Sequence, residues 1–136
     1  MIVVDTNIIA YLYLESDRSL QVEQVLEKDT DWAAPLLWRS ELRNILALYI
    51  RKKLMSLDDA QQIMREAMSL MKGREYEVAS FQVLELVASS ECSAYDCEFV
   101  ALADDLETSL VTVDKKILKE FPKIAVSLDG FIVSQK

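Results

Sequence analysis

The sequence predicts a three-layer α/β/α fold, with a central parallel sheet of about five strands and helices on both of its faces. Short apolar runs rich in β-branched residues alternate with longer segments whose apolar residues recur at helical spacing. One or two helices separate each run from the next, and crossovers of that length connect parallel strands. The 136 residues contain no internal repeat, no low-complexity segment and no linker, so we expect one domain over residues 1–136.

The first strand and the first helix meet at a polar break. Residues 2–4 read Ile-Val-Val, which is typical of a strand buried on both faces. Asp5, Thr6 and Asn7 interrupt this run, and an apolar helical pattern begins at Ile8. Asp5 therefore lies at the carboxyl edge of the predicted sheet, where open α/β sheets bind ligands. A role as helix N-cap explains the same placement, so this stretch alone leaves both interpretations open.

The next elements are a helix, a short strand and a long helix. The second helix of the chain covers residues 18 to about 28. A strand over residues 32–34 ends at Pro35, and the long helix that follows ends near residues 51–53. The apolar positions that we expect these two helices to bury are Leu20, Val22, Val25, Leu26, Trp38, Leu42, Ile45, Leu46 and Tyr49.

The second half of the chain continues the alternation. Helices are predicted over residues 57 to about 71, 81 to about 89, 94 to about 107 and 114 to 121, and strands over residues 76–79, 110–113 and 124–128. The expected N-caps of these helices are Ser56, Ser80, Ser93 and Asp114. Asp59 lies at the capping-box position after Ser56, and Gly73 and Pro122 end two of the helices. The helix from residue 94 is expected to bury Tyr95, Phe99, Leu102 and Leu106.

The composition excludes several kinds of catalytic site. The chain has no histidine, which removes every Ser-His and Cys-His arrangement and the usual zinc ligands. Its two glycines are too few for a glycine-rich phosphate loop. The two cysteines, Cys92 and Cys97, are expected to be reduced thiols near one helix. Any chemistry must therefore use carboxylates, hydroxyls, amides, lysine or arginine.

The charge distribution is uneven. The net charge of −8 argues against bulk electrostatic attraction to nucleic acid. Residues 39–74, however, hold eight basic and four acidic residues, whereas the rest of the chain holds seven basic and nineteen acidic ones. No apolar run reaches the ~18 residues of a membrane span, and no basic segment precedes the first strand. We therefore expect a cytoplasmic protein without a membrane partner.

Glu41 is the most informative carboxylate because it lies within a helix, where it has no capping role. Its neighbours in the same helical column are Leu37, Ile45 and Leu48, all of them apolar. A carboxylate in such a column loses hydration at a cost unless it meets a cation. A salt bridge to a nearby arginine, or a position at the edge of the buried face, is the alternative explanation.

Asp96 and Asp114 each have a structural explanation as well. Ser93 and Asp96 form a capping box, and Asp114 follows a strand and precedes a helix, as Asp5 does. If the strands before Asp5 and Asp114 are neighbours, three aspartates meet in one crevice that Glu41 reaches from the side. Four close carboxylates favour a divalent cation with a preference for oxygen ligands, Mg²⁺ or Mn²⁺. Such a site suits metal-assisted attack of water on a phosphodiester.

Four segments carry a family resemblance: DTN at residues 5–7, SELRN at 40–44, SAYDCEFVALA at 93–103 and LVTVDKKILK at 110–119. In this order and spacing they resemble the PIN domain, in particular the small VapC-type toxins of type II toxin–antitoxin pairs. The resemblance covers essentially the whole chain. Cys97 stands where the family usually carries a small residue.

The resemblance implies a PIN-like fold and a metal-dependent ribonuclease that cleaves single-stranded or loop regions of RNA. It implies that the metal ligands are Asp5, Glu41, Asp96 and Asp114, and that Thr6 or Asn7 and Thr112 orient them. It also implies a homodimer and a small cognate antitoxin, through which the pair contacts operator DNA. Candidate contacts to the RNA backbone are Arg39 and Arg43 around Glu41, and Lys115 and Lys116 beside Asp114.

Two other functions stay open at this point. An aspartate-based phosphatase or phosphotransferase also begins with a strand that ends in Asp, but it requires a second acid two residues later, where Asn7 stands. A non-catalytic regulatory module that only binds Mg²⁺ leaves Glu41 in its apolar column unexplained.

Overall fold

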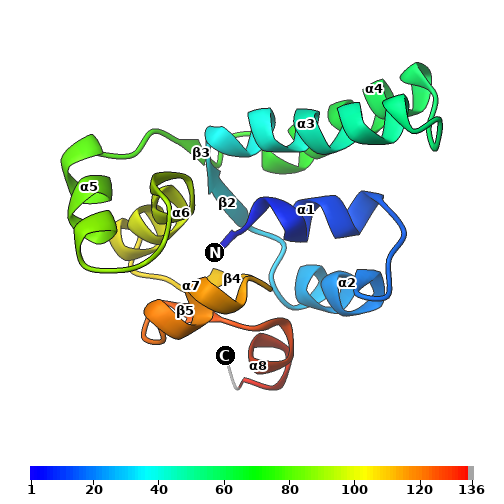
Figure 1. Ribbon diagram of the computed structural model, residues 1–136. Coiled ribbons are helices and arrows are strands. Elements are labelled where there is room, and N and C mark those ends of the chain that lie inside the picture. The colour runs from blue at the N-terminus through cyan, green and yellow to red at the C-terminus, as the bar shows by residue number, and fades with distance from the viewer. Residues whose placement is uncertain (135–136) are drawn as a thin grey trace.

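A five-stranded parallel sheet forms the centre of the computed structural model, which describes residues 1–134 (Figure 1). The strands are β1 (Ile2–Val4), β2 (Trp32–Pro35), β3 (Glu75–Tyr76), β4 (Leu110–Val111) and β5 (Ala125–Val126). Their order in the sheet is β3-β2-β1-β4-β5, and every neighbouring pair is parallel. The predicted α/β class and the number of strands are confirmed.

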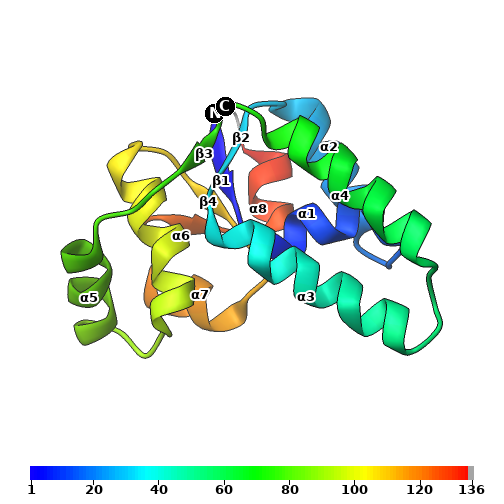
Figure 2. The same ribbon diagram turned by 90° about the horizontal axis from the view of Figure 1, so that it is seen from above.

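Helices cover both faces of the sheet. They are α1 (Thr6–Tyr13), α2 (Ser19–Lys28), α3 (Leu37–Arg51), α4 (Leu57–Met71), α5 (Ser80–Ala88), α6 (Ala94–Asp105), α7 (Lys115–Glu120) and α8 (Leu128–Val133). Helices α1 to α4 and α8 lie on one side of the sheet, and α5 to α7 lie on the other (Figure 2). No helix within residues 1–134 combines the length and apolarity needed to cross a membrane.

The chain reverses its direction through the sheet between β1 and β4. From β1 it moves outward to β2 and β3, and from β4 it moves the other way to β5. Val3 and Val4 of β1 pair with Leu110 and Val111 of β4. Open α/β sheets form a crevice at such a reversal point, beyond the carboxyl ends of the strands. This topology therefore brings the residues that follow β1 and β4 together.

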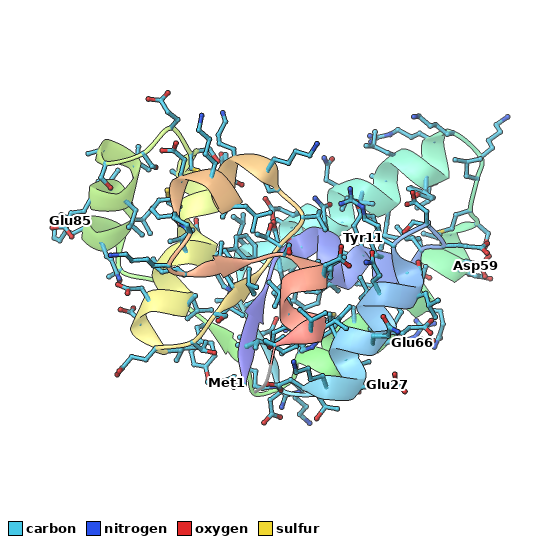
Figure 3. The ribbon with its side chains drawn as sticks, turned by 90° about the horizontal axis from the view of Figure 1, so that it is seen from below. Met1, Tyr11, Glu27, Asp59, Glu66 and Glu85 are labelled. Carbon is cyan, nitrogen blue, oxygen red and sulfur yellow. The ribbon has the colours of Figure 1, made fainter. Side chains whose placement is uncertain are left out.

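Helices α3 and α4 form an antiparallel pair that extends beyond the sheet (Figures 1 and 2). Figure 3 shows Asp59 at the far end of this pair and Glu85 on α5 at the opposite end of the molecule. The N-cap of α4 is Ser56, whose hydroxyl accepts a 3.1 Å hydrogen bond from the Asp59 N–H, as predicted. Most of the locally basic segment of the chain lies on this pair.

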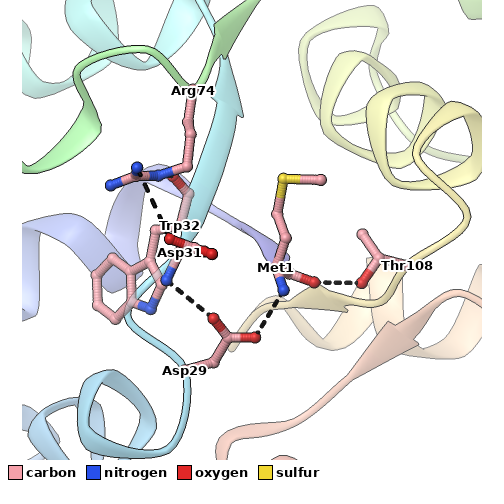
Figure 4. Close-up of polar contacts among 6 residues, drawn as sticks. All are labelled: Met1, Asp29, Asp31, Trp32, Arg74 and Thr108. Carbon is pink, nitrogen blue, oxygen red and sulfur yellow. Dashed lines mark hydrogen bonds and ion pairs between the residues drawn. The ribbon is translucent and has the colours of Figure 1, made fainter.

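At the amino edge of the sheet, polar contacts connect residues that precede β1, β2, β3 and β4 (Figure 4). The N-terminal ammonium of Met1 lies 3.0 Å from Oδ2 of Asp29, and the Thr108 hydroxyl donates to the Met1 carbonyl at 2.7 Å. Arg74 lies 3.8 Å from the Asp31 carboxylate. These contacts tie the strand starts together at the edge opposite Asp5.

Two of the predicted strands are wrong in their extent, and one predicted N-cap is misplaced. The strand expected over residues 76–79 forms only as β3, because Pro35 ends its partner β2 and the chain then turns into α3. The strand expected over residues 110–113 likewise pairs only over Leu110–Val111. Ser80 is the first residue of α5 and not its cap, and the cap residue Ala79 makes no side-chain hydrogen bond.

Helix α8 is missing from the sequence prediction, which extends the last strand to residue 128. In the structure β5 ends at Val126, and the Ser127 hydroxyl accepts from the Gly130 N–H at 3.0 Å, which caps α8. The sequence does contain a sign of this helix, because a serine followed two residues later by an acidic residue, here Ser127 and Asp129, is typical of a helix start. A six-residue helix gives too short an apolar pattern to compete with a strand assignment.

Two residues expected in the core are exposed. Leu20 is 71% exposed because it lies about 200° around α2 from the buried Val22. Tyr95 is 63% exposed because the first turn of α6 lies at the carboxyl edge of the sheet, beside a pocket. The other predicted helix faces are buried or half-buried, and Cys92 and Cys97 are buried free thiols, as expected.

Candidate metal centre

A pocket of about 400 Å³ opens at the carboxyl edge of the sheet. Its lining residues are Asp5, Thr6, Asn7, Leu37, Ser40, Glu41, Asn44, Ile45, Tyr95, Asp96 and Asp114. All four predicted carboxylates are therefore at one pocket. Each comes from a different part of the fold: the ends of β1 and β4, the middle of α3 and the first turn of α6.

Asp5 is the most buried of these carboxylates, with 8% of its surface exposed. Its Oδ1 accepts from the Thr6 N–H at 2.8 Å and its Oδ2 accepts from the Thr112 hydroxyl at 2.8 Å. Burial and, more weakly, the charges of Glu41 and Asp96 raise the pKa of Asp5 to about 6, against these two hydrogen bonds. Asp5 is both the N-cap of α1 and a wall of the pocket.

Glu41 is half-buried and points to the same place. Its Oε1 accepts from the Thr6 hydroxyl at 2.5 Å. Burial raises the pKa of Glu41, the Thr6 hydrogen bond opposes this, and the charges of Asp96 and Glu98 add to it. No ion pair of Glu41 is present within residues 1–134, so the salt-bridge explanation does not hold there. Its apolar column is shorter than expected, because Leu48 is 48% exposed.

Asp96 and Asp114 combine capping with a place in the pocket wall. The Asp96 N–H donates to the Ser93 hydroxyl at 3.1 Å, and Oδ1 of Asp114 accepts from the N–H groups of Lys116 and Ile117 at 2.8 and 3.1 Å. The pKa of Asp96 is raised by burial and by the charge of Asp114, against the Ser93 hydrogen bond and the charge of Lys116. Capping therefore accounts for the Asp114 carboxylate, whereas Asp96 gives only its backbone N–H to the Ser93 cap, and neither contact excludes a role in the pocket.

The residues expected to orient the carboxylates contact them. The Thr112 hydroxyl donates to Asp5 and accepts from the Asp114 N–H at 3.0 Å, so one fully buried side chain connects two of the acids. Thr6 connects Asp5 and Glu41 in the same way, through its N–H and its hydroxyl. Asn7 is exposed at the pocket wall.

The four basic candidates do not line the pocket. Arg39 forms a two-pronged contact with Glu75, with Nε and Nη2 at 2.6 and 2.7 Å from its carboxylate oxygens. Arg43 donates to the Ser40 hydroxyl at 3.1 Å. Lys115 and Lys116 begin α7 directly after Asp114. The positive charge of Lys116 acts to lower the pKa of Asp96. Of the residues the structure describes, no lysine or arginine is part of the pocket wall.

Sequence reasoning missed five lining residues: Leu37, Ser40, Asn44, Ile45 and Tyr95. The spacing of the four residues on α3 could have revealed them. Ser40, Asn44 and Ile45 lie three, seven and eight positions after Leu37, and Glu41 lies four positions after it, so all of them share one face of the helix. Tyr95 had no such signal, because its spacing to Phe99 is that of a buried face.

A family model described as the PIN domain matches residues 2–124. The chain belongs to the PIN domain family.

Among curated proteins, this PIN domain is similar to Ribonuclease VapC3 of Pyrobaculum aerophilum. The two are 27% identical over 126 residues, which are 90% of this chain and 96% of that protein. The similarity therefore covers nearly the full length of both chains.

Solved structures show the same fold. PAE2754 from Pyrobaculum aerophilum matches with a TM-score of 0.72 at 20% identity, over 97% of this chain and 93% of that one. FitAcB from Neisseria gonorrhoeae matches with a TM-score of 0.73 at 19% identity, over 93% and 96%. A toxin–antitoxin complex from Klebsiella pneumoniae matches with a TM-score of 0.71 at 18% identity, over 94% and 98%. At such identities the likeness establishes the PIN fold and not the activity.

The donor set of this PIN domain fits a hydrated Mg²⁺ or Mn²⁺ ion. Within residues 1–134, no three Asp, Glu or Cys side chains are placed so that they could hold a metal ion together. Mg²⁺ does not require such a group, since proteins commonly bind it through one or two carboxylates while it keeps several waters. The four carboxylates, the raised pKa values of Asp5, Glu41 and Asp96, and a wall without basic residues indicate negative charge that no protein cation neutralises, and a bound metal ion would neutralise it.

Proposed function

We propose that this PIN domain is a metal-dependent endoribonuclease that hydrolyses RNA phosphodiester bonds, and that it is the toxin of a toxin–antitoxin pair. The observation that carries the proposal is the pocket, in which four carboxylates from separate elements meet without a basic residue in the wall. The similarity to Ribonuclease VapC3 over nearly the full chain supports RNA as the substrate.

In this proposal Asp5, Glu41 and Asp96 hold one hydrated Mg²⁺ or Mn²⁺ ion, one or two of them directly and the rest through its waters, and Asp114 completes a second, substrate-dependent site. A bound divalent ion supplies a water of lowered pKa and stabilises charge on the scissile phosphate. Thr112 and Thr6 fix the carboxylate oxygens of Asp5 and Glu41 by the hydrogen bonds described above. The same contacts keep the two acids close together although their like charges repel.

We assign contacts to the RNA backbone to basic residues outside the pocket. Lys115 and Lys116 are the better candidates, because both are exposed beside Asp114. Arg43 is exposed on α3 two residues after Glu41. Arg39 is the weakest candidate, because its guanidinium is held by Glu75.

The partners follow from the same proposal. A small antitoxin would bind the chain and block the pocket, and the pair would reach operator DNA through the antitoxin. The fold shared with a Klebsiella toxin–antitoxin complex, and with a Rickettsia felis VapBC2 complex bound to promoter DNA, supports this assignment. A homodimer is proposed on the family resemblance alone.

An aspartyl phosphotransferase fits the chain less well. Asn7 occupies the position of the second acid that such an enzyme requires. A module that binds Mg²⁺ without catalysis differs from our proposal only in activity, so an assay separates them.

The test is cleavage of single-stranded RNA with Mn²⁺, with and without EDTA, by the unsubstituted chain and Asp5→Asn. We expect cleavage that EDTA abolishes and that Asp5→Asn lowers by more than about 100-fold. Asp59→Asn is the matched control, because Asp59 is an exposed acid at the far end of the α3–α4 pair (Figure 3). EDTA-sensitive cleavage that survives Asp5→Asn contradicts the proposed site. Phosphatase activity without cleavage of RNA would favour the phosphotransferase.

A further inference from the structure

We propose that Tyr95 binds the RNA by stacking on an unpaired base at the rim of the pocket, and so selects single-stranded RNA. The inference deepens the proposed function and depends on it for the identity of the substrate. It starts from a conflict between sequence and structure: the helical spacing assigns Tyr95 to the buried face of α6, yet the side chain is 63% exposed.

The exposure of Tyr95 belongs to the first turn of α6, where Ala94 is exposed as well. Its neighbours along α6, from Cys97 to Ala103, are buried except for Glu98. Tyr95 lines the same pocket as Asp5, Glu41, Asp96 and Asp114. A tyrosine ring in water exposes apolar surface that a core position would bury, and here that surface lies directly beside the proposed reaction site.

The pocket needs a source of affinity other than charge. Its wall contains four carboxylates and no lysine or arginine of the described chain, so the proposed ion and the basic residues outside the wall attract phosphates, while the base gains no cationic contact from the wall. Stacking on an aromatic ring holds a base without any charge and tolerates every base, because each has a flat face. The polar hydroxyl and amide groups of Ser40 and Asn44 in the wall are compatible with such a neutral contact.

One other exposed large aromatic residue occurs within residues 1–134. Phe81 on α5 is 85% exposed, but it does not line this pocket. Exposure alone therefore does not distinguish Tyr95 from Phe81. What distinguishes Tyr95 is its position beside the four carboxylates. Phe81 serves as the matched control for the loss of an exposed ring.

The backbone that presents Tyr95 is held in place. Ser93 caps α6 through the Asp96 N–H, and its carbonyl accepts from the Cys97 N–H at 3.0 Å. Cys97, two residues after Tyr95, is fully buried. A ring on a fixed backbone has only two side-chain torsions to order on binding, so stacking costs little entropy. Bases in a duplex are already stacked, so only unpaired bases can use Tyr95 in this way.

The test measures binding apart from cleavage. A fluorescein-labelled single-stranded RNA of mixed sequence is titrated with the unsubstituted chain, Tyr95→Ala, Tyr95→Phe and Phe81→Ala, and Kd is read from fluorescence anisotropy. Ca²⁺ is the divalent cation, because it takes oxygen ligands as Mg²⁺ does. A gel afterwards verifies that the RNA is intact. The same RNA annealed to its complement is titrated in parallel.

We expect Tyr95→Ala to raise the Kd for single-stranded RNA by roughly 5- to 100-fold. Tyr95→Phe and Phe81→Ala should stay within about twofold, because the first keeps the ring and the second lies outside the pocket. The Kd for the duplex should not depend on Tyr95. Equal losses for single-stranded and duplex RNA, a loss in Tyr95→Phe as large as in Tyr95→Ala, or no effect of Tyr95→Ala would each overturn the inference, as would failure of the unsubstituted chain to bind single-stranded RNA.

The two proposals can fail separately. Binding of single-stranded RNA that depends on Tyr95, together with no cleavage in Mn²⁺, keeps the stacking contact and removes the nuclease. Metal-dependent cleavage with a Kd that is independent of Tyr95 does the reverse.

Discussion

Asp5 is the residue at which stability and the proposed activity conflict most directly. In an unfolded chain its carboxyl has a pKa of 3.8, whereas burial raises this pKa to about 6 in the folded chain. Between these pH values the folded state binds more protons than the unfolded state, so the free energy of unfolding falls as the pH rises from about 4 to about 6. The loss amounts to about 3 kcal/mol at most, since each pKa unit corresponds to ~1.4 kcal/mol.

The variant Asp5→Asn should therefore be more stable than the unsubstituted chain at pH 7 in EDTA, by about 1–3 kcal/mol. The amide is neutral and of similar size, accepts from the Thr6 N–H and donates to the Thr112 hydroxyl. Urea unfolding at pH 4.5 and pH 7 measures the effect, and the variant should lose much of the pH dependence between these values. Asp59→Asn, at an exposed site, is the control. Lower stability of Asp5→Asn at pH 7 would contradict this account.

The Glu75 carboxylate of β3 links helix α3 to the sheet edge by side-chain hydrogen bonds, in addition to the packing of buried Trp38, Leu42 and Leu46. Glu75 accepts from the indole N–H of Trp38 at 2.7 Å and from two nitrogens of Arg39. The Arg39 guanidinium and, more weakly, Trp38 hold the pKa of Glu75 below its usual value, against partial burial. Because α3 also carries Glu41, this contact helps to fix the pocket wall. Trp38 is fully buried, so its N–H has no access to water if Glu75 is removed.

We expect Glu75→Ala to lower the free energy of unfolding by about 1–3 kcal/mol, mainly through the unpaired N–H of Trp38. Glu75→Gln keeps an acceptor and should lose less. In a double-mutant cycle with Trp38→Phe, the two losses should be less than additive, because the phenylalanine has no N–H to leave unpaired. Strict additivity in urea unfolding would show that the indole contact is not the source of the effect.

On the scale of the whole molecule, the parallel order of the strands concentrates negative charge at one edge of the sheet. The ends of β1 and β4 and the nearby turns of α3 and α6 each contribute one carboxylate. The proposed cation would stabilise the folded state, because the unfolded chain does not hold the four acids together.

Mn²⁺ should therefore raise the thermal unfolding midpoint, with a gain of about 2.7 kcal/mol at a concentration 100 times the Kd. Differential scanning fluorimetry with Mn²⁺ and with EDTA measures this gain independently of any RNA substrate. Asp5→Asn and Asp114→Asn should lose most of the shift, whereas Asp59→Asn should keep it. A shift of the same size in all three variants would place the cation elsewhere on the molecule.

The sequence by itself determined the class of the fold and the candidate carboxylates. The apolar runs and the helical spacing fix which segments cross the core, so β1, β2 and the long helices α3, α4 and α6 followed from local patterns. The absence of histidine and of glycine-rich loops left carboxylates as the chemical groups to consider. Asp5 and Asp114 stood out because each follows an apolar run and precedes a helix, which is a local property of the chain.

Only the tertiary structure decided how far the short strands extend and which side chains share the pocket. The length of β3 depends on where its partner β2 ends, and the exposure of Tyr95 depends on the sheet ending beneath the first turn of α6. The Thr112 hydroxyl contacts Asp5, 107 positions away, as well as the nearby Asp114, and the long-range contact arises from the pairing of β1 with β4. Local patterns cannot carry such information, because it arises from strand order, and strand order is set by the packing of the whole chain.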